Sequence, residues 1–542
     1  MAVPDARPEA SPQPPSEVSS QVPIDRCAAR IETAPPALSL TRYAPAAVLI
    51  AVLLADSNRH TDPDLWGHLR FGQVFITERH LLHRDVYSYS AAGHLWRDHE
   101  WLAEVVMAAV YNAAGAAGLK LWKFACTATA LLLVADTEAS TGAPPAIQLA
   151  ILFAAGFGFL LQAQLRPQMF SFVLLGALLA LLARDNYRRG ARLWLAVPLM
   201  ALWANLHGGF FIGIATMALY SAVTALCDLA SGAGCRRGMK LFLLTVTASA
   251  ATLINPYGIG MWETVAHALR NPYTRNVVND WQPLWWAMRA QWHSAPSGVV
   301  LYLAVIAMVV ALAVALAAAP RADDLPLVAV AAMMTLAAFL SVRNMALAAM
   351  TVSGPLARHL ALWASQRVGP SPRPAAQWRP ASHFAILALA CVMVLKGGLF
   401  SHRLVPDRAY PRATLAFMSA HGLHGNVLGE FGWGEYLIWH SAPDDKVFID
   451  GRYDTVYPFE VIRDYLEFYF DEPGADGVLD SYPHDFVLIG LLAPARRLME
   501  RRQDWKLLYR DADALLYVRA SAPAASLPGL PVTGAAQPGG FP

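Results

Sequence analysis

The sequence predicts an α-helical polytopic membrane protein with a small soluble α/β domain near its C-terminus. Hydrophobic residues make up 56% of the 542 residues, whereas charged residues make up only 15%. Apolar segments recur between residues 43 and 400, and the composition becomes that of a water-soluble domain after residue 400. Because a soluble fold cannot bury so much apolar sequence, the composition excludes a purely soluble protein.

Charge and cysteine usage narrow the class further. In a membrane protein the position of basic residues matters more than their sum, so the net charge of +2 gives no indication of nucleic acid. The five cysteines show neither a CxxC motif nor the spacing of metal ligands. We therefore expect no nucleic-acid partner and no disulfide framework. The cysteines are Cys27, Cys126, Cys227, Cys235 and Cys391.

Both ends of the chain are predicted to be disordered. Residues 1–42 are rich in Pro, Ala and Ser and lack the apolar core of a signal peptide. Arg26, Arg30 and Arg42 precede the first apolar run, which favours a cytoplasmic N-terminal tail. Residues 521–542 are rich in Pro, Gly and Ala and form the second predicted tail.

The predicted transmembrane domain covers residues 43–400. If every apolar segment crosses the membrane, the basic stretch 184–192 falls outside, against the positive-inside rule. We therefore expect segment 101–117, which ends in a Gly/Ala turn, to lie in the interface. About eleven spans result, with a first outside loop at 57–118. The apolar segments are 43–56, 101–117, 119–136, 144–163, 165–184, 192–206, 208–228, 241–254, 298–319, 325–341, 345–362 and 383–400.

This topology places several polar clusters at the extracytoplasmic ends of spans, on the side of the first outside loop. Polar groups that converge from many helices on one membrane surface predict a site for a charged or hydroxylated ligand. The clusters are Gln164 to Gln168, Asn205 to Gly209, Asn255 to Gly258, Asp280 to Pro283, and Arg343 with Asn344.

The first outside loop contains the strongest candidate site. Asp62 and Asp64 lie two residues apart beside a membrane span, where carboxylates are costly unless they face water, a cation or a substrate. They also fit a second interpretation, in which they cap the following helix. His99 and Glu100 suit a divalent cation near this pair, although solvated histidines explain the pattern as well.

The other candidates also have two interpretations. Arg166 is either a site cation or the snorkelling start of a span, and Arg343 is either a site cation or an interfacial anchor. His207 is either a site residue or part of a Gly-rich helix contact. Trp281, Trp285, Trp286 and Trp292 suit an interfacial belt or sugar stacking. Asp450-Gly451-Arg452 indicates a turn held by an ion pair or a ligand contact.

Residues 401–520 are predicted to form a small α/β domain on the extracytoplasmic side. Short strand-like runs alternate there with amphipathic stretches, which is typical of such a fold. The runs are 427–428, 446–449, 486–489 and 514–518, and the amphipathic stretches are 459–470 and 494–502.

Taken together, these features resemble the GT-C superfamily of glycosyltransferases, and most closely its bacterial, largely uncharacterised membrane proteins. The resemblance covers roughly residues 43–519, and its motifs are specific as a group rather than singly. They are Asp62-Pro63-Asp64-Leu65-Trp66, His99-Glu100-Trp101-Leu102, Arg166-Pro167-Gln168, Asn205-Leu206-His207-Gly208-Gly209 and Asp450-Gly451-Arg452. The long periplasmic domain and WWDYG signature of oligosaccharyltransferases are missing, and Glu430 to Tyr436 is only superficially similar to that signature.

The resemblance implies an inverting transfer of a sugar from a polyprenyl-phosphate donor to a lipid or glycan acceptor at the outer face of the bacterial inner membrane. Asp62 or Asp64 would be the general base. The implied donor-phosphate contacts are the cationic side chains of Arg166, His207 and Arg343, and the implied substrate contacts are His99, Glu100, Asn205 and Gln168. No cofactor is implied with certainty, and a divalent cation is a candidate.

Two other functions fit the same sequence. A transporter or flippase would place buried charges near the middle of the spans, whereas here the polar clusters lie at span ends on one side. A non-catalytic glycolipid-binding protein would retain an intact but unused carboxylate pair. The position of the clusters favours the transferase.

Overall fold

The structure, a computed structural model, describes residues 60–160, 162, 164–188, 192–271, 273, 279–294, 296–368, 405–406 and 410–527. All of them belong to one unit of the chain, Leu40–Pro542. The predicted spans 43–56 and 383–400, the N-terminal tail, Cys27 and Cys391 lie outside the described residues. So does the C-terminal tail from residue 528 onward. The folded chain continues past the predicted boundary at residue 520, because η8 (Pro523–Ser526) packs Ala525 into a core.

Every apolar segment predicted within the described part of the chain forms a helix. Five helical segments are long and apolar enough to cross a membrane: Trp101–Ser140, Gln168–Arg188, Phe210–Ala230, Gly298–Ala318 and Ala322–Leu340. The number of about eleven spans stays a prediction. The helices are α3 (Trp101–Ser140), α4 (Pro145–Leu160), α5 (Gln168–Arg188), α6 (Ala196–Leu206), α7 (Phe210–Ala230), α8 (Arg236–Ala251), α9 (Gly260–Arg270), α11 (Leu284–Ser294), α12 (Pro296–Ala318), α13 (Leu325–Leu340) and α14 (Met345–Val368).

Helix α3 contains a break where the sequence predicts a Gly/Ala turn. Gly115 has φ 57° and ψ −149°, so two helical segments meet at this residue. A side chain at this φ would strain the backbone, whereas glycine adopts it readily. The separation of segment 101–117 from the following helix is confirmed. Its position in the membrane interface stays a prediction.

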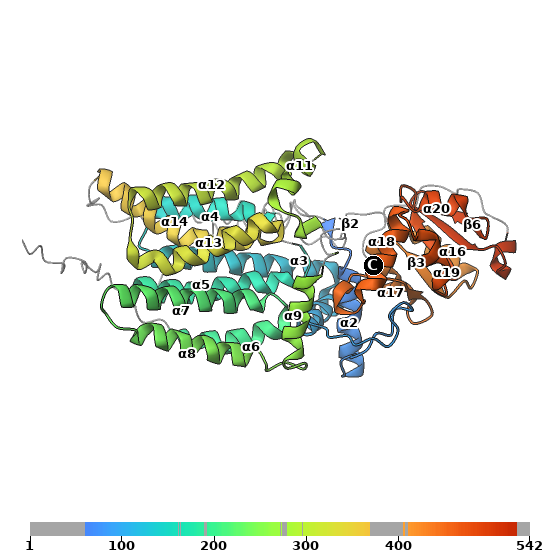
Figure 1. The fold of residues 1–542 in the computed structure, drawn as a ribbon, viewed down its shortest axis with the longest axis horizontal. Coiled ribbons are helices and arrows are strands. Elements are labelled where there is room, and N and C mark those ends of the chain that lie inside the picture. The colour runs from blue at the N-terminus through green and yellow to red at the C-terminus, as the bar shows by residue number, and fades with distance from the viewer. Residues whose placement is uncertain are drawn as a thin grey trace, which may run out of the picture. The chain divides into compact units, whose positions relative to one another are not determined.

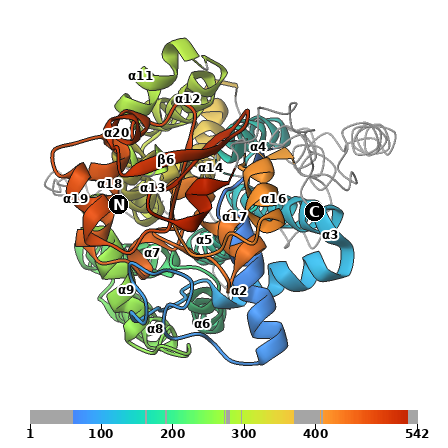
Figure 2. The same cartoon turned by 90° about the vertical axis from the view of Figure 1, so that its right-hand side faces the viewer.

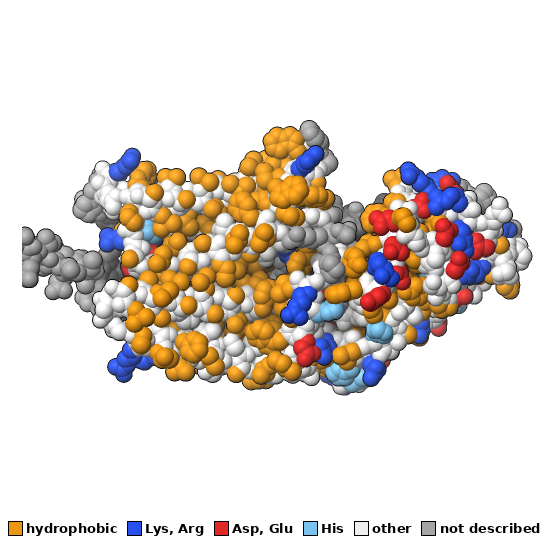
Figure 3. Space-filling view, viewed as in Figure 1, with side chains coloured by type: hydrophobic (Ala, Val, Ile, Leu, Met, Phe, Trp, Pro, Cys, Tyr) orange, Lys and Arg blue, Asp and Glu red, His pale blue; other side chains and the backbone are white. Residues whose placement is uncertain are grey.

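The helices pack side by side around one apolar core and also expose apolar side chains (Figures 1 and 2). Figure 3 shows hydrophobic side chains over most of the visible bundle surface, with Lys and Arg at its two ends. Leu226 is 64% exposed and Val314 is 63% exposed. So much exposed apolar surface is what lipid contact requires. The chain is a multi-pass membrane protein.

Basic residues predicted to share one membrane side gather at one end of the bundle. Arg184 at the end of α5 pairs with Asp136 near the end of α3, with Nη2 and Oδ1 2.7 Å apart. Arg237 at the start of α8 pairs with Asp185 at the same distance. The ends of these helices therefore meet, as the positive-inside topology requires.

The C-terminal residues form a mixed five-stranded sheet in the order β4-β3-β5-β7-β6. Strands β3 (Asn426–Gly429), β4 (Lys446–Val447) and β5 (Phe486–Gly490) are parallel, and β7 (Ala514–Arg519) and β6 (Trp505–Arg510) add antiparallel strands. The predicted strands and helices are confirmed, although β4 is shorter than expected. Four elements were not predicted: β6, α16 (Arg412–Ala420), α17 (Gly434–Ser441) and α19 (Ala475–Ser481). The two amphipathic stretches are α18 (Phe459–Phe470) and α20 (Arg496–Arg501).

The first outside loop and the C-terminal domain share a second apolar core. Helix α2 (Leu65–Glu78) of the loop packs against α17, and the two lie together in Figures 1 and 2. Trp66 is 1% exposed and its ring lies 4.9 Å from the ring of Tyr436. Ser88 forms a parallel bridge with Val447 of the edge strand β4. Strand β1 (His60–Thr61) pairs with β2 (Val405–Pro406) in the same way. The loop and the domain therefore lie on the same side of the membrane.

Trp66→Ala tests this shared core. Truncation of a fully buried tryptophan costs about 3–5 kcal/mol of unfolding free energy. We expect a lower thermal midpoint in detergent and faster proteolysis within residues 57–118. Leu95→Ala is the control because Leu95 lies in the same loop and is 53% exposed. Equal midpoints for the two variants would contradict a shared core.

Candidate active site

A cavity of about 980 Å³ lies where the loop, the helix ends and the C-terminal domain meet. One part of its wall is charged, and it comes from the loop, the starts of α5 and η5 (Val342–Asn344), and the C-terminal domain. Another part is apolar and comes from one face each of α7 and α13. The apolar side chains are Phe211, Ile212, Ala215, Met333, Met334, Ala337 and Leu340.

Eight of the nine residues predicted for the site line this cavity. They are Asp62, Asp64, His99, Glu100, Arg166, Gln168, His207 and Arg343. Asn205 does not line it. Its side-chain oxygen accepts a hydrogen bond from Trp101 Nε1 at 3.2 Å, and its amide donates to the Ile254 carbonyl at 2.7 Å. These contacts tie α6 to its neighbours, so a substrate role for Asn205 stays a prediction without support from this geometry.

Asp62 is held by a cation and is not free to react. It is 2% exposed, and its carboxylate forms an ion pair with Arg166 Nε. Arg166 Nη1 also donates to Asp280 Oδ2 at 2.9 Å, so one guanidinium bridges two carboxylates. The other oxygen of Asp62 accepts the backbone N–H of Asp64 at 2.9 Å. Asp62 therefore positions both Arg166 and the turn that carries Asp64.

Asp64 lines the cavity, and its carboxylate forms no ion pair with a cation of the described residues. It occupies the N-cap position of α2, but its side chain makes no capping hydrogen bond. This excludes the capping interpretation for Asp64. Burial, with the nearby charge of Asp62, raises the pKa of Asp64 to about 7. A carboxyl group with this pKa exchanges protons near neutral pH, as a general base must.

Glu435 at the start of α17 reaches the same place from the C-terminal domain. It is 3% exposed, and its Oε2 accepts the backbone N–H of Gly67 at 3.0 Å. A Cβ on Gly451 would lie 2.4 Å from Asp64 Oδ1 and 2.6 Å from Glu435 Oε1. Both carboxyl groups therefore converge on the Gly451 backbone, and only glycine leaves them room. Burial and the neighbouring Asp64 raise the pKa of Glu435 well above its usual range.

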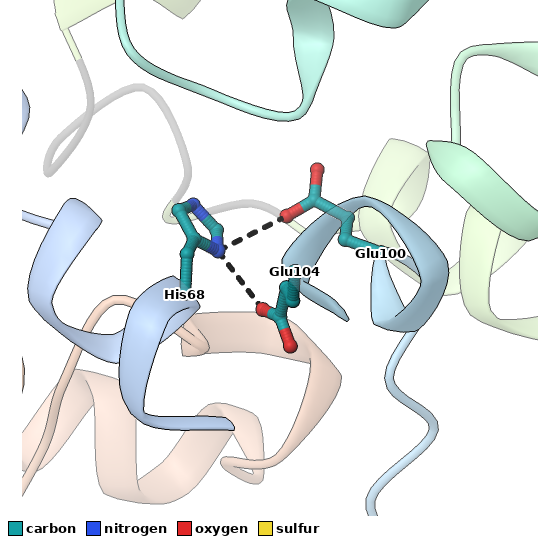
Figure 4. Close-up of side chains that lie close together, drawn as sticks. All are labelled: His68, Glu100 and Glu104. Carbon is teal, nitrogen blue, oxygen red and sulfur yellow. Dashed lines mark hydrogen bonds and ion pairs between the residues drawn. The ribbon is translucent and has the colours of Figure 1, made fainter. Parts of the chain in front are cut away.

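His68, Glu100 and Glu104 form a cluster that has the composition of a cation site (Figure 4). One ligand atom from each lies within 4.8 Å of the others. His68 Nδ1 is 2.9 Å from Glu104 Oε1 and 3.8 Å from Glu100 Oε2. Glu104 is 3% exposed, and its carboxyl group also forms a hydrogen bond with the buried carboxyl group of Asp98. Neighbouring buried carboxyl groups are stabilised by a shared proton or by a cation.

His207 is neutral rather than cationic. Its Nδ1 accepts the N–H of Gly209 at 2.9 Å and lies 2.8 Å from Ser171 Oγ, so the proton is on Nε2. Nε2 points toward Glu100 Oε1 at 3.4 Å. Burial lowers the pKa of His207 to about 3. His207 thus offers a hydrogen-bond donor to the cavity, in place of the positive charge that the sequence suggested.

Arg343 is the best-placed cation for an anionic ligand. Its guanidinium lies over the Trp281 ring, 5.5 Å from the centroid, and forms no ion pair with a carboxylate of the described residues. Arg166, by contrast, already bridges two carboxylates. Leu340, three residues before Arg343, belongs to the apolar wall, so Arg343 lies at the edge of that wall. A ligand with an anionic head and an apolar tail fits this arrangement.

Arg452 holds the C-terminal domain against the loop. Its guanidinium forms two hydrogen bonds with Asp450, at 2.9 and 2.7 Å, and an ion pair with Asp85 of the loop at 2.7 Å. The predicted turn held by an ion pair is confirmed. The rings of Phe71, Tyr87 and Trp96 surround the guanidinium at 5.4, 5.2 and 4.8 Å. These cation–π contacts fix the position of Gly451 beside Asp64.

The sequence alone did not identify several cavity residues. Asp280 belongs to a predicted polar cluster, but nothing in the sequence connects it with Arg166. Glu435 lies in the segment from Glu430 to Tyr436, and the superficial similarity of that segment to an oligosaccharyltransferase signature was the available signal. Glu104 and Asp454 carry no spacing signal of their own, whereas His68 is one of the histidines of the first outside loop that could supply a metal ligand.

Solved structures show which fold this is. The chain is similar to the apo oligosaccharyltransferase of Archaeoglobus fulgidus, with 13% identity over 84% of this chain and 70% of that chain and a TM-score of 0.50. Two further similar structures have TM-scores of 0.48 and 0.45. They are the arabinofuranosyltransferase AftD from Mycobacteria (14% identity, 88% and 40% coverage) and ArnT from Cupriavidus metallidurans bound to undecaprenyl phosphate (11% identity, 88% and 97% coverage).

No protein-family model matches the sequence, and no curated protein matches it as a sequence relative. The chain shares the fold of the Archaeoglobus fulgidus oligosaccharyltransferase. The resemblance seen in the sequence motifs is thereby confirmed at the level of the fold.

Gly451→Ala tests the convergence of the two carboxyl groups. A Cβ at this position overlaps Asp64 and Glu435, and overpacking of this kind costs about 1–3 kcal/mol of unfolding free energy. Gly477→Ala is the matched control, because its Cβ meets nothing within 4 Å. We expect a lower thermal midpoint for Gly451→Ala alone. Identical midpoints would show that the carboxyl groups do not face Gly451.

Proposed function

We propose that this protein is a membrane glycosyltransferase that moves a sugar from a polyprenyl-phosphate donor to a lipid or glycan acceptor. The observation that carries the proposal is the single cavity with an apolar wall and a charged wall, on a GT-C fold. A lipid-linked donor likewise combines an apolar polyprenyl chain with a charged phosphate. ArnT, one of the similar structures, contains bound undecaprenyl phosphate, which agrees with a donor of this class.

The donor's place follows from the two walls. The polyprenyl chain lies along the apolar face of α7 and α13, and its phosphate meets Arg343. Negative charge grows on this phosphate as the sugar leaves, so the guanidinium stabilises the transition state more than the ground state. His207 Nε2–H and Gln168 supply hydrogen bonds nearby. Arg166 keeps its two carboxylate partners and orients Asp62.

Asp64 is the general base in this reaction. The acceptor hydroxyl attacks the anomeric carbon, the bond from that carbon to the phosphate oxygen breaks, and the lipid phosphate leaves with the bonding electrons. The hydroxyl proton passes to Asp64. His99, Glu100 and the C-terminal domain line the part of the cavity where the acceptor enters. We place the reaction at the extracytoplasmic face of a bacterial inner membrane, with the N-terminus in the cytoplasm, as the basic loops indicate.

Asp64→Asn is the decisive variant for the activity. We would measure transfer of radiolabel from a panel of polyprenyl-phosphate sugars to endogenous membrane acceptors, at matched expression. Loss of a general base lowers the rate by about 10²- to 10⁴-fold. For wild type, transfer rises with pH through about 7, because Asp64 must lose its proton first.

Two comparison variants complete this experiment. Asp444→Asn, at an exposed position of the C-terminal domain, retains full transfer. Asp62→Asn also reduces transfer, but it lowers the thermal midpoint as well, because it removes one carboxylate partner of the partly buried Arg166. Folded wild-type protein that turns over no donor of the panel would favour a transporter or a non-catalytic glycolipid-binding protein.

We also propose that His68, Glu100 and Glu104 hold a divalent cation. Carboxylate oxygens with one imidazole suit Mn²⁺ or Mg²⁺. The cation offsets the charge of Glu100 and Glu104. The distances within the cluster and the burial of Glu104 support this role.

Binding of Mn²⁺ to the native state raises the thermal midpoint of purified, chelator-treated wild-type protein, and the rise grows with the logarithm of the Mn²⁺ concentration above the dissociation constant. We expect Glu104→Gln to lose this shift. Glu78→Gln, at an exposed position of the same loop, retains it. A shift of equal size in all three proteins would place the cation elsewhere, and no shift in wild type would contradict the cation site.

A further inference from the structure

We infer that Glu435 of the C-terminal domain is a positioning residue for the general base, the second carboxyl group of a pair with Asp64 that holds one proton between them. This inference rests on the proposed function. In this pair Asp64 takes the proton of the acceptor hydroxyl while Glu435 remains protonated and donates a hydrogen bond to it. The catalytic centre is therefore built from two parts of the chain that are far apart in sequence.

The geometry of Glu435 gives the first reason. Its Oε2 accepts the backbone N–H of Gly67 at 3.0 Å, so this oxygen is a hydrogen-bond acceptor and does not carry the proton. The proton of Glu435 is therefore left for Oε1, the oxygen that shares the Gly451 position with Asp64 Oδ1. Both oxygens lie within 2.6 Å of one point, the position of a Cβ on Gly451, and of the two only Glu435 Oε1 is left to carry a proton that Asp64 Oδ1 can accept.

The charges around the pair give the second reason. The groups that face Glu435 are Asp62, Asp64, Asp450, Arg452 and, from the start of α3, Glu104. Arg452 is engaged by Asp450 and Asp85, and no cation among the described residues forms an ion pair with Glu435. Two buried carboxylates side by side cannot both remain ionised, so such pairs share a proton.

The proton balance of the transfer step follows from this arrangement. Before the reaction the pair carries one proton, on Glu435. The acceptor oxygen forms its bond to the anomeric carbon, the lipid phosphate departs, and the hydroxyl proton moves to Asp64. The pair then carries two protons, and one returns to water before the next turnover. The hydrogen bond from Glu435 keeps Asp64 oriented toward the acceptor.

The pH dependence of transfer distinguishes this role from a structural one. For wild type we expect an acid limb, where Asp64 gains a proton, and an alkaline limb, where the pair loses its last proton. Glu435→Gln keeps a donor at this position, so it retains transfer within about 10-fold of wild type and loses the alkaline limb. Glu435→Ala loses about 100-fold at every pH.

The control is Glu430→Gln, five residues earlier, whose Oε1 accepts the N–H of Gly490 instead of facing the cavity. It keeps the wild-type profile with both limbs. An alkaline limb unchanged in Glu435→Gln would overturn the proposal. So would an equal loss of transfer at every pH in Glu435→Gln and Glu435→Ala, which is the result of a structural role.

A second measurement needs no donor, so it fails independently of the proposed function. Folding raises the pKa of both carboxyl groups, so their stabilising contribution is complete below about pH 4 and is lost as pH rises through the folded-state values. The thermal midpoint of Glu435→Gln therefore rises relative to wild type between about pH 5 and about pH 9. The thermal midpoint of Asp64→Asn rises relative to wild type in the same way. The double variant shows little further rise beyond that of either single variant. Parallel pH curves for all four proteins would overturn the pair even if wild type transfers sugar.

Discussion

The packing of the first outside loop onto the C-terminal domain is the constraint on which the rest of the site depends. Trp66 enters the core of the domain, and the Arg452 guanidinium joins Asp450 of the domain to Asp85 of the loop. Without these contacts the wall that carries Glu435 and Gly451 would be missing from the cavity. The membrane helices supply the opposite wall, so the cavity exists only when all three parts are assembled.

The second constraint is the electrostatic repulsion between the carboxyl groups in one cavity. This repulsion is relieved in one of two ways, by an ion pair or by a bound proton. Asp62 and Asp280 share the charge of Arg166, whereas Asp64 and Glu435 form no ion pair with a cation of the described residues, and their pKa values are raised. Within the same part of the chain, no carboxylate forms an ion pair with Arg343. In the proposed function, Asp62 is therefore a positioning residue, Asp64 receives the proton and Arg343 binds the phosphate.

Much of this arrangement is predictable from sequence because it depends on local patterns. Uninterrupted apolar runs predicted the helices, and carboxylates beside a membrane span predicted Asp62 and Asp64. Contacts between residues far apart in the chain could not be predicted from sequence. Gly67 and Glu435, for example, lie 368 positions apart and meet only through tertiary packing. Asn205 shared a motif with His207, yet its amide bonds to Trp101 and Ile254, away from the cavity. His207 was expected to be cationic, but the N–H of Gly209 fixes it as a neutral donor.

The most direct test of the central claim is the structure of the purified protein with a polyprenyl phosphate bound, determined by cryo-electron microscopy. We predict that the phosphate lies within hydrogen-bond distance of Arg343 and that the chain follows the apolar face of α7 and α13. A phosphate bound instead at the basic end of the bundle near Arg184, or a cavity that remains without lipid at saturating concentration, would contradict a lipid-linked donor in this site.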